Sequence, residues 1–277
     1  MDICRDVGFV HLHVHSSYSL REGALTIAAL VKHAKADDQP ALAITDTNNL
    51  FGALEFSEKL AKEGVQPIVG VQIGVDFDDV ATPTSGLQRP GGNGGLVLLA
   101  RDEAGYQALM RLVSRAWLDS SADGVPRAHV AALAEDTAGL IALTGGPAGP
   151  LDTLLREGAF DLAARRLGRL REMFGDRLYI ELQRHGDEAG RAAEPYLRDM
   201  AYRASLPLVA TNEPYFAARS DFEAHDALLC ISEGATLGED DRRRLTPEHR
   251  FKTRAEMRTL FADLPEATDN SVAIALR

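Results

Sequence analysis

Apolar and polar positions follow two different periods along this chain. The segment FVHLHVH (9–15) alternates at every second residue, which predicts a strand, and LTIAALVKHAK (25–35) repeats its apolar residues at helical spacing. Further strands are predicted at 41–46, 66–77, 96–100, 140–145, 178–183 and 207–213, with helices between most of them. Because regular β/α alternation calls for a parallel sheet covered by helices, we expect an α/β fold, either a closed barrel or an open doubly wound sheet.

The alternation fades after Phe216, where helices joined by polar loops are predicted instead. We therefore expect a β/α barrel over residues 1–216 and a helical extension over residues 217–277 that leads out of it. The chain stops inside the apolar-periodic stretch NSVAIALR without a capping residue, which suggests a piece of a longer polypeptide.

Composition narrows the classes of protein that fit. The 277 residues contain no apolar run of about 20 residues and no signal-peptide pattern, so we expect a cytoplasmic protein with no membrane partner. Cys4 and Cys230 are expected to be free thiols. The net charge of −11 argues against an autonomous duplex-binding module, and the arginine runs at 165–171 and 242–244 are expected to be solvated, salt-bridged faces.

Nucleotide-binding motifs are missing from the sequence. No GxGxxG follows the first predicted strand, and no GxxxxGK[ST] is present. The glycine-rich stretch PGGNGG (90–95) has neither the lysine nor the helix of a phosphate loop, so we expect a flexible connection there.

Three histidines share one face of the first predicted strand. His11, His13 and His15 are two residues apart, and the last two lie at the carboxyl end, where α/β sites are built. Imidazole is a good ligand for zinc, manganese or iron. Histidines hydrogen-bonded at a barrel mouth without metal would give the same pattern, and the spacing alone leaves both readings open.

Several longer segments stand in the order and spacing of a known family. They are FVHLHVHSSYSLREGA, ALAITDTNNLFGALEF, IVGVQIGV, LVLLARDEAGYQALMRLVSRA, GLIALTGG, LVATNEPYF and FKTRAEMRTLFADLPEATDNSV. Over essentially its whole length the chain resembles the amino-terminal PHP (polymerase and histidinol phosphatase) domain of bacterial replicative DNA polymerase III α subunits. The resemblance implies a distorted seven-stranded (β/α) barrel whose strand ends can hold up to three metal ions, with a polymerase core following in the same polypeptide.

The resemblance also identifies nine metal-ligand positions, of which five have lost their ligand type. The positions that keep one are His13, His15, Glu22 and Glu213. The positions that have lost it are Thr47, Gln72, Gly95, Gly146 and Tyr215. Asp46 is expected to cap the turn at 47–49 or to support a ligand, and Tyr215 to fill the space of an imidazole and bond to a neighbour such as His13.

These losses decide the function that the resemblance implies. Phosphodiester hydrolysis at such a site needs two or more cations, so we expect no catalytic residue and no cofactor in this chain, or at most one zinc or manganese ion at the four retained positions. Magnesium would belong to the polymerase core, which makes the parent protein a DNA-directed DNA polymerase, a nucleotidyltransferase of DNA replication.

This chain would then buttress that core, dock the proofreading exonuclease subunit ε and meet DNA only indirectly. The alternatives are a self-contained metal-dependent phosphoesterase and a 3′→5′ exonuclease of the same superfamily.

Overall fold

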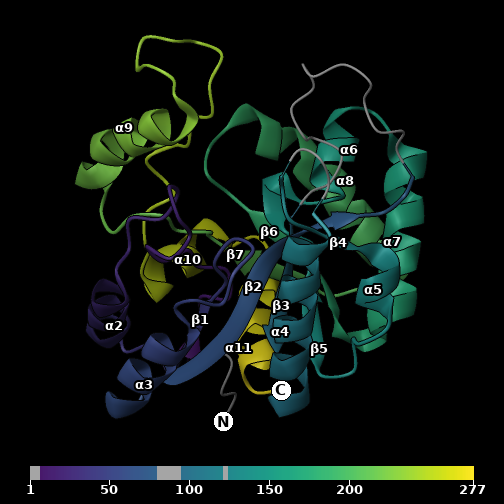
Figure 1. The fold of residues 1–277 in the computed structure, drawn as a ribbon, viewed down its shortest axis with the longest axis horizontal. Coiled ribbons are helices and arrows are strands. Elements are labelled where there is room, and N and C mark those ends of the chain that lie inside the picture. The colour runs from purple at the N-terminus through teal and green to yellow at the C-terminus, as the bar shows by residue number, and fades with distance from the viewer. Residues whose placement is uncertain (1–6, 80–94, 121–123) are drawn as a thin grey trace.

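A curled sheet surrounded by helices makes up the computed structural model, which describes residues 7–79, 95–120 and 124–277 (Figure 1). The strands are β1 (Ala41–Ile44), β2 (Gln66–Asp76), β3 (Gly95–Ala100), β4 (Arg127–His129), β5 (Leu140–Leu143), β6 (Leu178–Gln183) and β7 (Leu208–Thr211). Their order is β1-β2-β3-β5-β6-β7, with β4 paired to β2 off this path. The predicted α/β class is confirmed, and the described strands form a curled half-barrel.

Residues 9–15, predicted as the first strand, are extended but do not form a regular strand. The amide of Ala43 donates to the carbonyl of His11 at 2.9 Å, whereas the amide of Val14 donates to the Thr45 side-chain hydroxyl at 2.8 Å. On the other side, the amide of His15 donates to the carbonyl of Pro214 at 3.2 Å. A side chain thus replaces part of the backbone ladder, and the segment links the chain beyond β1 to the chain beyond β7.

The expectation of a wholly parallel sheet is wrong at β3. This strand pairs antiparallel with β2, where Gln72 faces Val97, and antiparallel with β5, where Val97 faces Leu143. No helical pattern was predicted between 77 and 96, and an antiparallel neighbour needs no crossover helix. Consequently Gly95, at the amino end of β3, lies at the same edge as the carboxyl ends of the parallel strands.

Helices cover the sheet on its outer side (Figure 1). They are α2 (Ile27–Ala36), α3 (Ala53–Lys62), α4 (Glu103–Leu118), α5 (Val130–Ala134), α6 (Asp152–Arg156), α7 (Phe160–Phe174), α8 (Glu188–Ala204), α9 (Phe222–Glu233), α10 (Arg254–Leu260) and α11 (Pro265–Ala275). Four of them begin at a side chain that accepts a hydrogen bond from the amide three residues later, namely Thr26, Asp102, Asp187 and Thr253. Such caps stabilise a helix by about 1 kcal/mol each.

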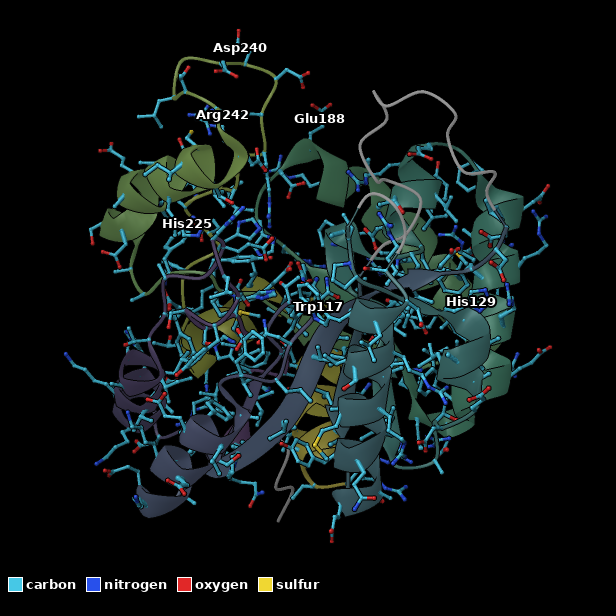
Figure 2. All side chains as sticks on the ribbon, viewed as in Figure 1. Trp117, His129, Glu188, His225, Asp240 and Arg242 are labelled. Carbon is cyan, nitrogen blue, oxygen red and sulfur yellow. The ribbon has the colours of Figure 1, made fainter. Side chains whose placement is uncertain are left out.

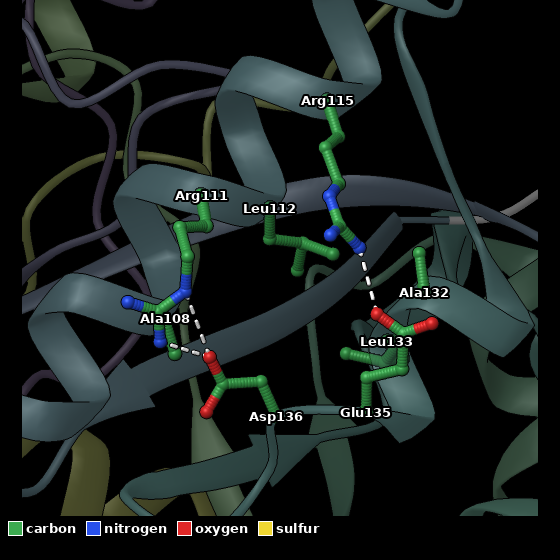
Figure 3. A pocket seen from close by; sticks show the side chains of 8 residues that line it. All are labelled: Ala108, Arg111, Leu112, Arg115, Ala132, Leu133, Glu135 and Asp136. Carbon is green, nitrogen blue, oxygen red and sulfur yellow. Dashed lines mark hydrogen bonds and ion pairs between the residues drawn. The ribbon is translucent and has the colours of Figure 1, made fainter.

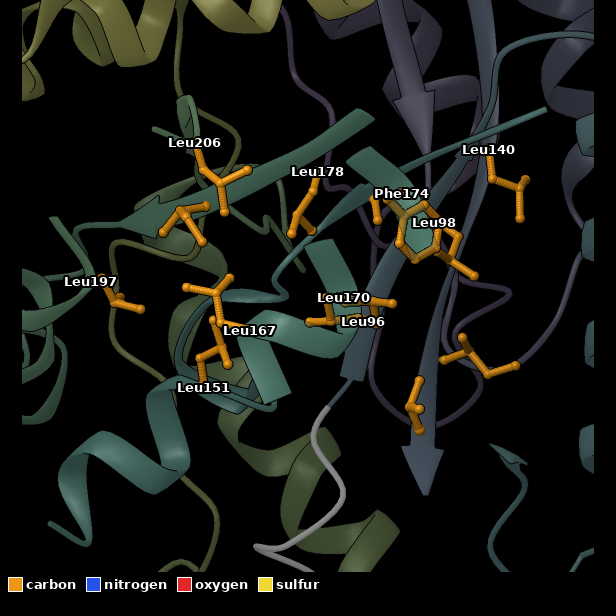
Figure 4. Packing of buried hydrophobic residues seen from close by; sticks show 14 of the residues in the cluster. Leu96, Leu98, Leu140, Leu151, Leu167, Leu170, Phe174, Leu178, Leu197 and Leu206 are labelled. Atoms are coloured by element: carbon orange, nitrogen blue, oxygen red, sulfur yellow. The ribbon is translucent and has the colours of Figure 1, made fainter. Parts of the chain in front are cut away.

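The largest hydrophobic cluster lies between the sheet and these helices. Figure 4 shows Leu96 and Leu98 of β3 packed near Leu170 and Phe174 of α7. The last helices belong to the same core, because Phe261 is fully buried in that cluster. Burial of a side chain of this size contributes about 1.5–3 kcal/mol. Part of the segment 217–277 therefore packs into the core of the sheet.

Two arginines predicted to be solvated are buried instead. Arg166 is fully buried, with Nε and Nη2 donating to Asp79 at 2.9 and 2.7 Å and its guanidinium 4.7 Å from the Phe77 ring centroid. Arg242 makes two 2.7 Å hydrogen bonds to Asp226. A carboxylate that accepts two hydrogen bonds from one guanidinium compensates for the desolvation of that guanidinium. Runs of charged residues in the sequence do not reveal such a contact.

Two smaller expectations concern cysteines and membranes. Cys230 is a buried free thiol, and Cys4 lies outside the described residues. Within the described part of the chain, no helix has the length and apolar character needed to cross a membrane.

Candidate functional site

Side chains from distant parts of the chain meet at the edge of the sheet where the parallel strands end. His13 and His15 come from the segment 9–15, and Glu213 follows β7. Oε1 of Glu213 lies 3.3 Å from Nε2 of His15 and 3.5 Å from Nε2 of His13. All three side chains are buried, and one potential ligand atom from each lies within 4.8 Å of the others. Glu213 also has a left-handed backbone, with φ at 46°, which is unusual for a residue other than glycine.

His13 is engaged on its other side by Glu181, a residue that the sequence analysis did not single out. Nδ1 of His13 lies 2.7 Å from Oε1 of Glu181, and both side chains are fully buried. Burial alone would lower the pKa of His13, but the charges of Glu181 and Glu213 outweigh it and raise that pKa. Burial would raise the pKa of Glu181, but His13 outweighs it and lowers that pKa. Each member of this pair therefore favours the charged form of the other.

The remaining bonds of Glu181 come from its own sheet and from the loop after β5. The backbone amide of Gly145 donates to Oε2 at 2.8 Å, the side-chain amide of Gln183 to Oε1 at 3.0 Å, and the hydroxyl of Thr211 also to Oε1. A carboxylate with several such donors is stabilised in its ionised form. An acidic residue inside the apolar strand LYIELQ was the available signal for it.

Tyr215 occupies the space beside His15. Its ring stacks on that imidazole with 4.3 Å between centroids and 7° between planes, and its hydroxyl donates to Oε1 of Glu213 at 2.8 Å. The expected hydrogen bond of Tyr215 is thus made to Glu213 instead of His13. Burial and the charge of Glu213 raise the pKa of Tyr215 well above its ordinary value, so the hydroxyl remains a donor.

Glu22 lies apart from the group of His13, His15 and Glu213. Its Oε1 accepts from Nη1 of Arg243 at 2.6 Å, and its Oε2 accepts from the hydroxyl of Thr47 at 2.7 Å. Burial would raise the pKa of Glu22, but the charge of Arg243 outweighs it and the pKa is lowered. Arg243 belongs to a run predicted to be solvated, and nothing in the sequence pattern distinguished it from its neighbours.

Asp46 organises the loop after the histidines. It accepts hydrogen bonds from the amide and hydroxyl of Ser16 and from the hydroxyl of Ser19, each at 2.7 Å. The Ser19 hydroxyl is in turn 2.9 Å from Nδ1 of His15. The turn at 47–49 is capped by Asn49, whose amide donates to the carbonyl of Thr47 at 2.9 Å. Asp46 therefore acts on His15 through Ser19.

Two of the lost ligand positions are filled by neighbouring amides. A Cβ atom at Gly146, where φ is 59°, would lie 2.5 Å from the Gln183 side chain. A Cβ atom at Gly95 would lie 2.9 Å from Cγ of Gln72, whose Nε2 donates to Glu213 at 3.3 Å. The space of a longer side chain at each glycine is therefore already occupied.

The donor set can be tested against the metals that the family implies. A three-metal cluster does not fit, because amides, hydroxyls and a guanidinium stand where anionic or imidazole ligands are needed. His13, His15 and Glu213 are a ligand set for one ion at most, and Nε2 of His13 has no hydrogen-bond partner although it is buried. His13 would bind metal only through a nitrogen that carries no proton, and Nδ1 already faces Glu181.

An open basin of about 1010 Å³ lies over the outer residues of the site. Its lining includes Glu22, Thr47, Gln72, Gly95, Tyr215 and Arg243. A smaller hollow of about 170 Å³ between α4 and α5 is bridged by the ion pairs Arg111 with Asp136 and Arg115 with Glu135 (Figure 3). None of the residues that line this hollow belongs to the site.

Comparison with curated proteins finds DNA polymerase III α subunits. The chain is 49% identical over 270 residues to that of Caulobacter vibrioides, covering 98% of this chain and 23% of the relative. It is 38% identical over 276 residues to that of Thermus aquaticus, covering 96% of this chain and 22% of the relative. The chain thus spans about a quarter of the length of these relatives.

Solved structures resemble the fold more distantly. A protein described as a metal-dependent phosphoesterase from Bifidobacterium adolescentis is 14% identical, with a TM-score of 0.46, covering 74% of this chain and 86% of that one. An amidohydrolase from Chromobacterium violaceum is 17% identical, with a TM-score of 0.45, covering 74% and 87%.

The family model for the PHP domain matches residues 11–185, which contain His13, His15 and Glu181. With this match over more than half of its length, the chain belongs to the PHP domain family.

Proposed function

We propose that this chain is the amino-terminal PHP domain of a cytoplasmic replicative DNA polymerase III α subunit, and that its site is structural and not catalytic. The domain would form a distorted seven-stranded barrel in which residues 9–15 complete the sheet. Homology to named α subunits over nearly the whole chain supports this assignment. Template-directed nucleotide addition would be carried out by the remaining three quarters of such a polypeptide, with magnesium bound there.

The observation that carries the structural role is the closed hydrogen-bonded network at the strand ends. Glu213 Oε1 is contacted by Tyr215, Gln72 and His15, and both oxygens of Glu22 are occupied. A hydrolytic site needs a positioned cation or base facing open space, where it can activate a water molecule. Here most of the polar groups bond to one another and Nε2 of His13 is left unpaired, so the network would stabilise the barrel mouth.

The second part of the proposal concerns partners. The domain would support the polymerase core of its own polypeptide and dock the proofreading subunit ε. The net charge of −11 fits contacts with protein better than direct contacts with phosphate backbones, so DNA would be reached only through these partners.

Three measurements on the purified chain test this function. Elemental analysis is expected to find less than about a tenth of an equivalent of zinc or manganese, with no effect of EDTA on the melting temperature. Single-stranded DNA and bis-p-nitrophenyl phosphate should remain uncleaved with added Mn²⁺ or Zn²⁺. The purified chain should also bind an ε subunit, as measured by calorimetry. Cleavage above the level of a His13→Gln, Glu213→Gln double variant would contradict the structural role, and absence of ε binding would contradict docking.

A second candidate, a single-metal phosphoesterase, is favoured by one observation. The separations of 3.3 and 3.5 Å between Glu213 Oε1 and the two imidazole nitrogens match the ligand spacing around a tetrahedral zinc ion, which is about 3.4 Å for bonds of about 2.1 Å. One stoichiometric ion together with hydrolysis of the phosphodiester would place this candidate first.

A further inference from the structure

We propose that the guanidinium of Arg243 is a built-in cation of this site, which links Glu22 to Glu213 and keeps divalent metal ions out. The inference goes beyond the proposed function, because it gives the mechanism of exclusion to a side chain that is not one of the family's ligand positions. It does not depend on docking of any partner.

The contacts of Arg243 connect Glu22 and Glu213. Nη1 donates directly to Glu22 at 2.6 Å, and Nη2 lies 3.5 Å from the Tyr215 hydroxyl, which itself donates to Glu213 at 2.8 Å. The guanidinium carbon also lies 5.8 Å from the centroid of the Tyr215 ring, within the range of a cation–π contact. One cation thus joins both carboxylates, directly on one side and through a hydroxyl on the other.

The loop that carries Arg243 is held against α9 by contacts of Arg243 itself and of Arg242. The amide of Arg243 is 3.3 Å from Oε2 of Glu233, and the preceding Arg242 forms the two-pronged pair with Asp226 of α9. His225 of α9 contacts the carbonyl of Glu22 through Nε2 at 2.6 Å. Figure 2 shows His225 below α9, toward the barrel, and Arg242 on the loop above the helix. The contacts of this loop with α9 therefore hold the guanidinium of Arg243 in the site.

Charge explains why this arrangement excludes a metal ion. Glu22, Glu181 and Glu213 are carboxylates that would otherwise attract a divalent cation, and burial makes an uncompensated negative charge costly. Arg243 supplies a positive charge directly beside Glu22 and, through the Tyr215 hydroxyl, on the side of Glu213. A metal ion entering beside His13, His15 and Glu213 would meet the guanidinium nearby and would find Glu22 already engaged.

The experiment compares zinc uptake by the 277-residue chain, the variant Arg243→Met and the matched control Arg244→Met, an exposed neighbour. Each is stripped with EDTA, desalted and equilibrated with about a tenfold excess of Zn²⁺ before elemental analysis and a melting curve. We expect about one equivalent in Arg243→Met and less than about a tenth in the other two. Zinc should raise the melting temperature of Arg243→Met by about 5 °C and leave the others unchanged.

Two results of this experiment would overturn the proposal. No uptake by Arg243→Met, whatever its melting temperature, would overturn it and leave the structural function intact. Stoichiometric zinc uptake by the unmodified chain would overturn both this proposal and the structural function. If Arg243→Met is unfolded without metal, far-UV circular dichroism during Zn²⁺ addition replaces the melting curve: recovery of the native spectrum supports the proposal, and no recovery overturns it.

Discussion

His13 and Glu181 form a fully buried pair whose Nδ1 and Oε1 atoms are 2.7 Å apart. The pair joins the amino-terminal segment to β6, two parts of the chain separated by 168 residues. Burial lowers the pKa of this imidazole, and the charges of Glu181 and Glu213 together outweigh that effect, so Glu181 connects the electrostatics of the site to the stability of the sheet.

Replacing Glu181 with glutamine should therefore destabilise the fold. The variant keeps the shape but removes one of the two carboxylate charges beside a buried imidazole, which costs about 3 kcal/mol in the free energy of unfolding. Urea unfolding followed by circular dichroism measures this loss. The exposed Glu58→Gln in α3 is the control and should change stability by less than about 0.5 kcal/mol. Equal effects of the two substitutions would contradict a stabilising role for the pair.

Asp152 gives a pH dependence. Burial raises its pKa to about 8, and its Oδ2 has no hydrogen-bond partner. A carboxyl whose pKa is higher in the folded state than in the unfolded state binds more protons when folded, so stability falls as the pH rises from about 4 to about 8.

Asp152→Asn should remove this pH dependence. We expect it to match the unmodified chain near pH 4 and to be more stable by about 5 kcal/mol at pH 8, because each pKa unit corresponds to about 1.4 kcal/mol. Denaturant midpoints across this range provide the measurement, with the exposed Asp161→Asn as control. A constant difference between Asp152→Asn and the unmodified chain at every pH would show that Asp152 does not titrate in this window.

The ion pair of Arg242 with Asp226 should fix the loop after α9. Its side chains are only 2% and 8% exposed, so Arg242→Met leaves a buried carboxylate unpaired and should cost about 3–5 kcal/mol. Limited proteolysis should cut within residues 234–246 sooner in this variant. Arg203→Met removes the partner of Asp199 from a pair that is 80% and 52% exposed, and should change neither readout.

Gly146 and Gln183 should be energetically coupled. Gly146→Ala is strained by its positive φ and by contact with the amide of Gln183, so a loss of about 2–3 kcal/mol is expected. In a Gln183→Ala background the same substitution should cost at least about 1 kcal/mol less, which a double-mutant cycle measures. Strict additivity would show that the amide does not occupy the space of the missing side chain.

Six of the seven described strands were predictable because their apolar runs are short and bounded, whereas β4 (Arg127–His129) was missed because it has three residues and no apolar run. The first predicted strand is irregular for a local reason. The amide of Val14 donates to the hydroxyl of Thr45, so the backbone bonds from Ala43 to His11 and from Thr45 to Val14 do not form a continuous ladder. The orientation of β3 was missed because alternation of strands and helices implies direction only when a helix crosses over. The spacing of the histidines correctly predicted that His13 and His15 lie close together.

The rest of the site lay beyond sequence reasoning. Arg243 reaches Glu22 across 221 positions of the chain, and neither residue has a local signal for that contact. Glu181 did leave a signal, since a lone acid in an apolar strand has to find donors. The match between Gln183 and Gly146 depends on two strand ends whose spacing appears only in three dimensions.

The amino-terminal histidine segment, residues 9–15, is held mainly by residues that are synthesised much later. The amide of Val10 donates to Ser271 across 261 positions, and His11 contacts the carbonyl of Lys252 across 241. Contacts of such long range form slowly and late in folding. During synthesis from the amino end, this segment must wait for most of the chain to leave the ribosome before its partners exist. A nascent chain halted before α11 would therefore carry its histidines in an unfinished barrel, as a natural substrate for chaperones.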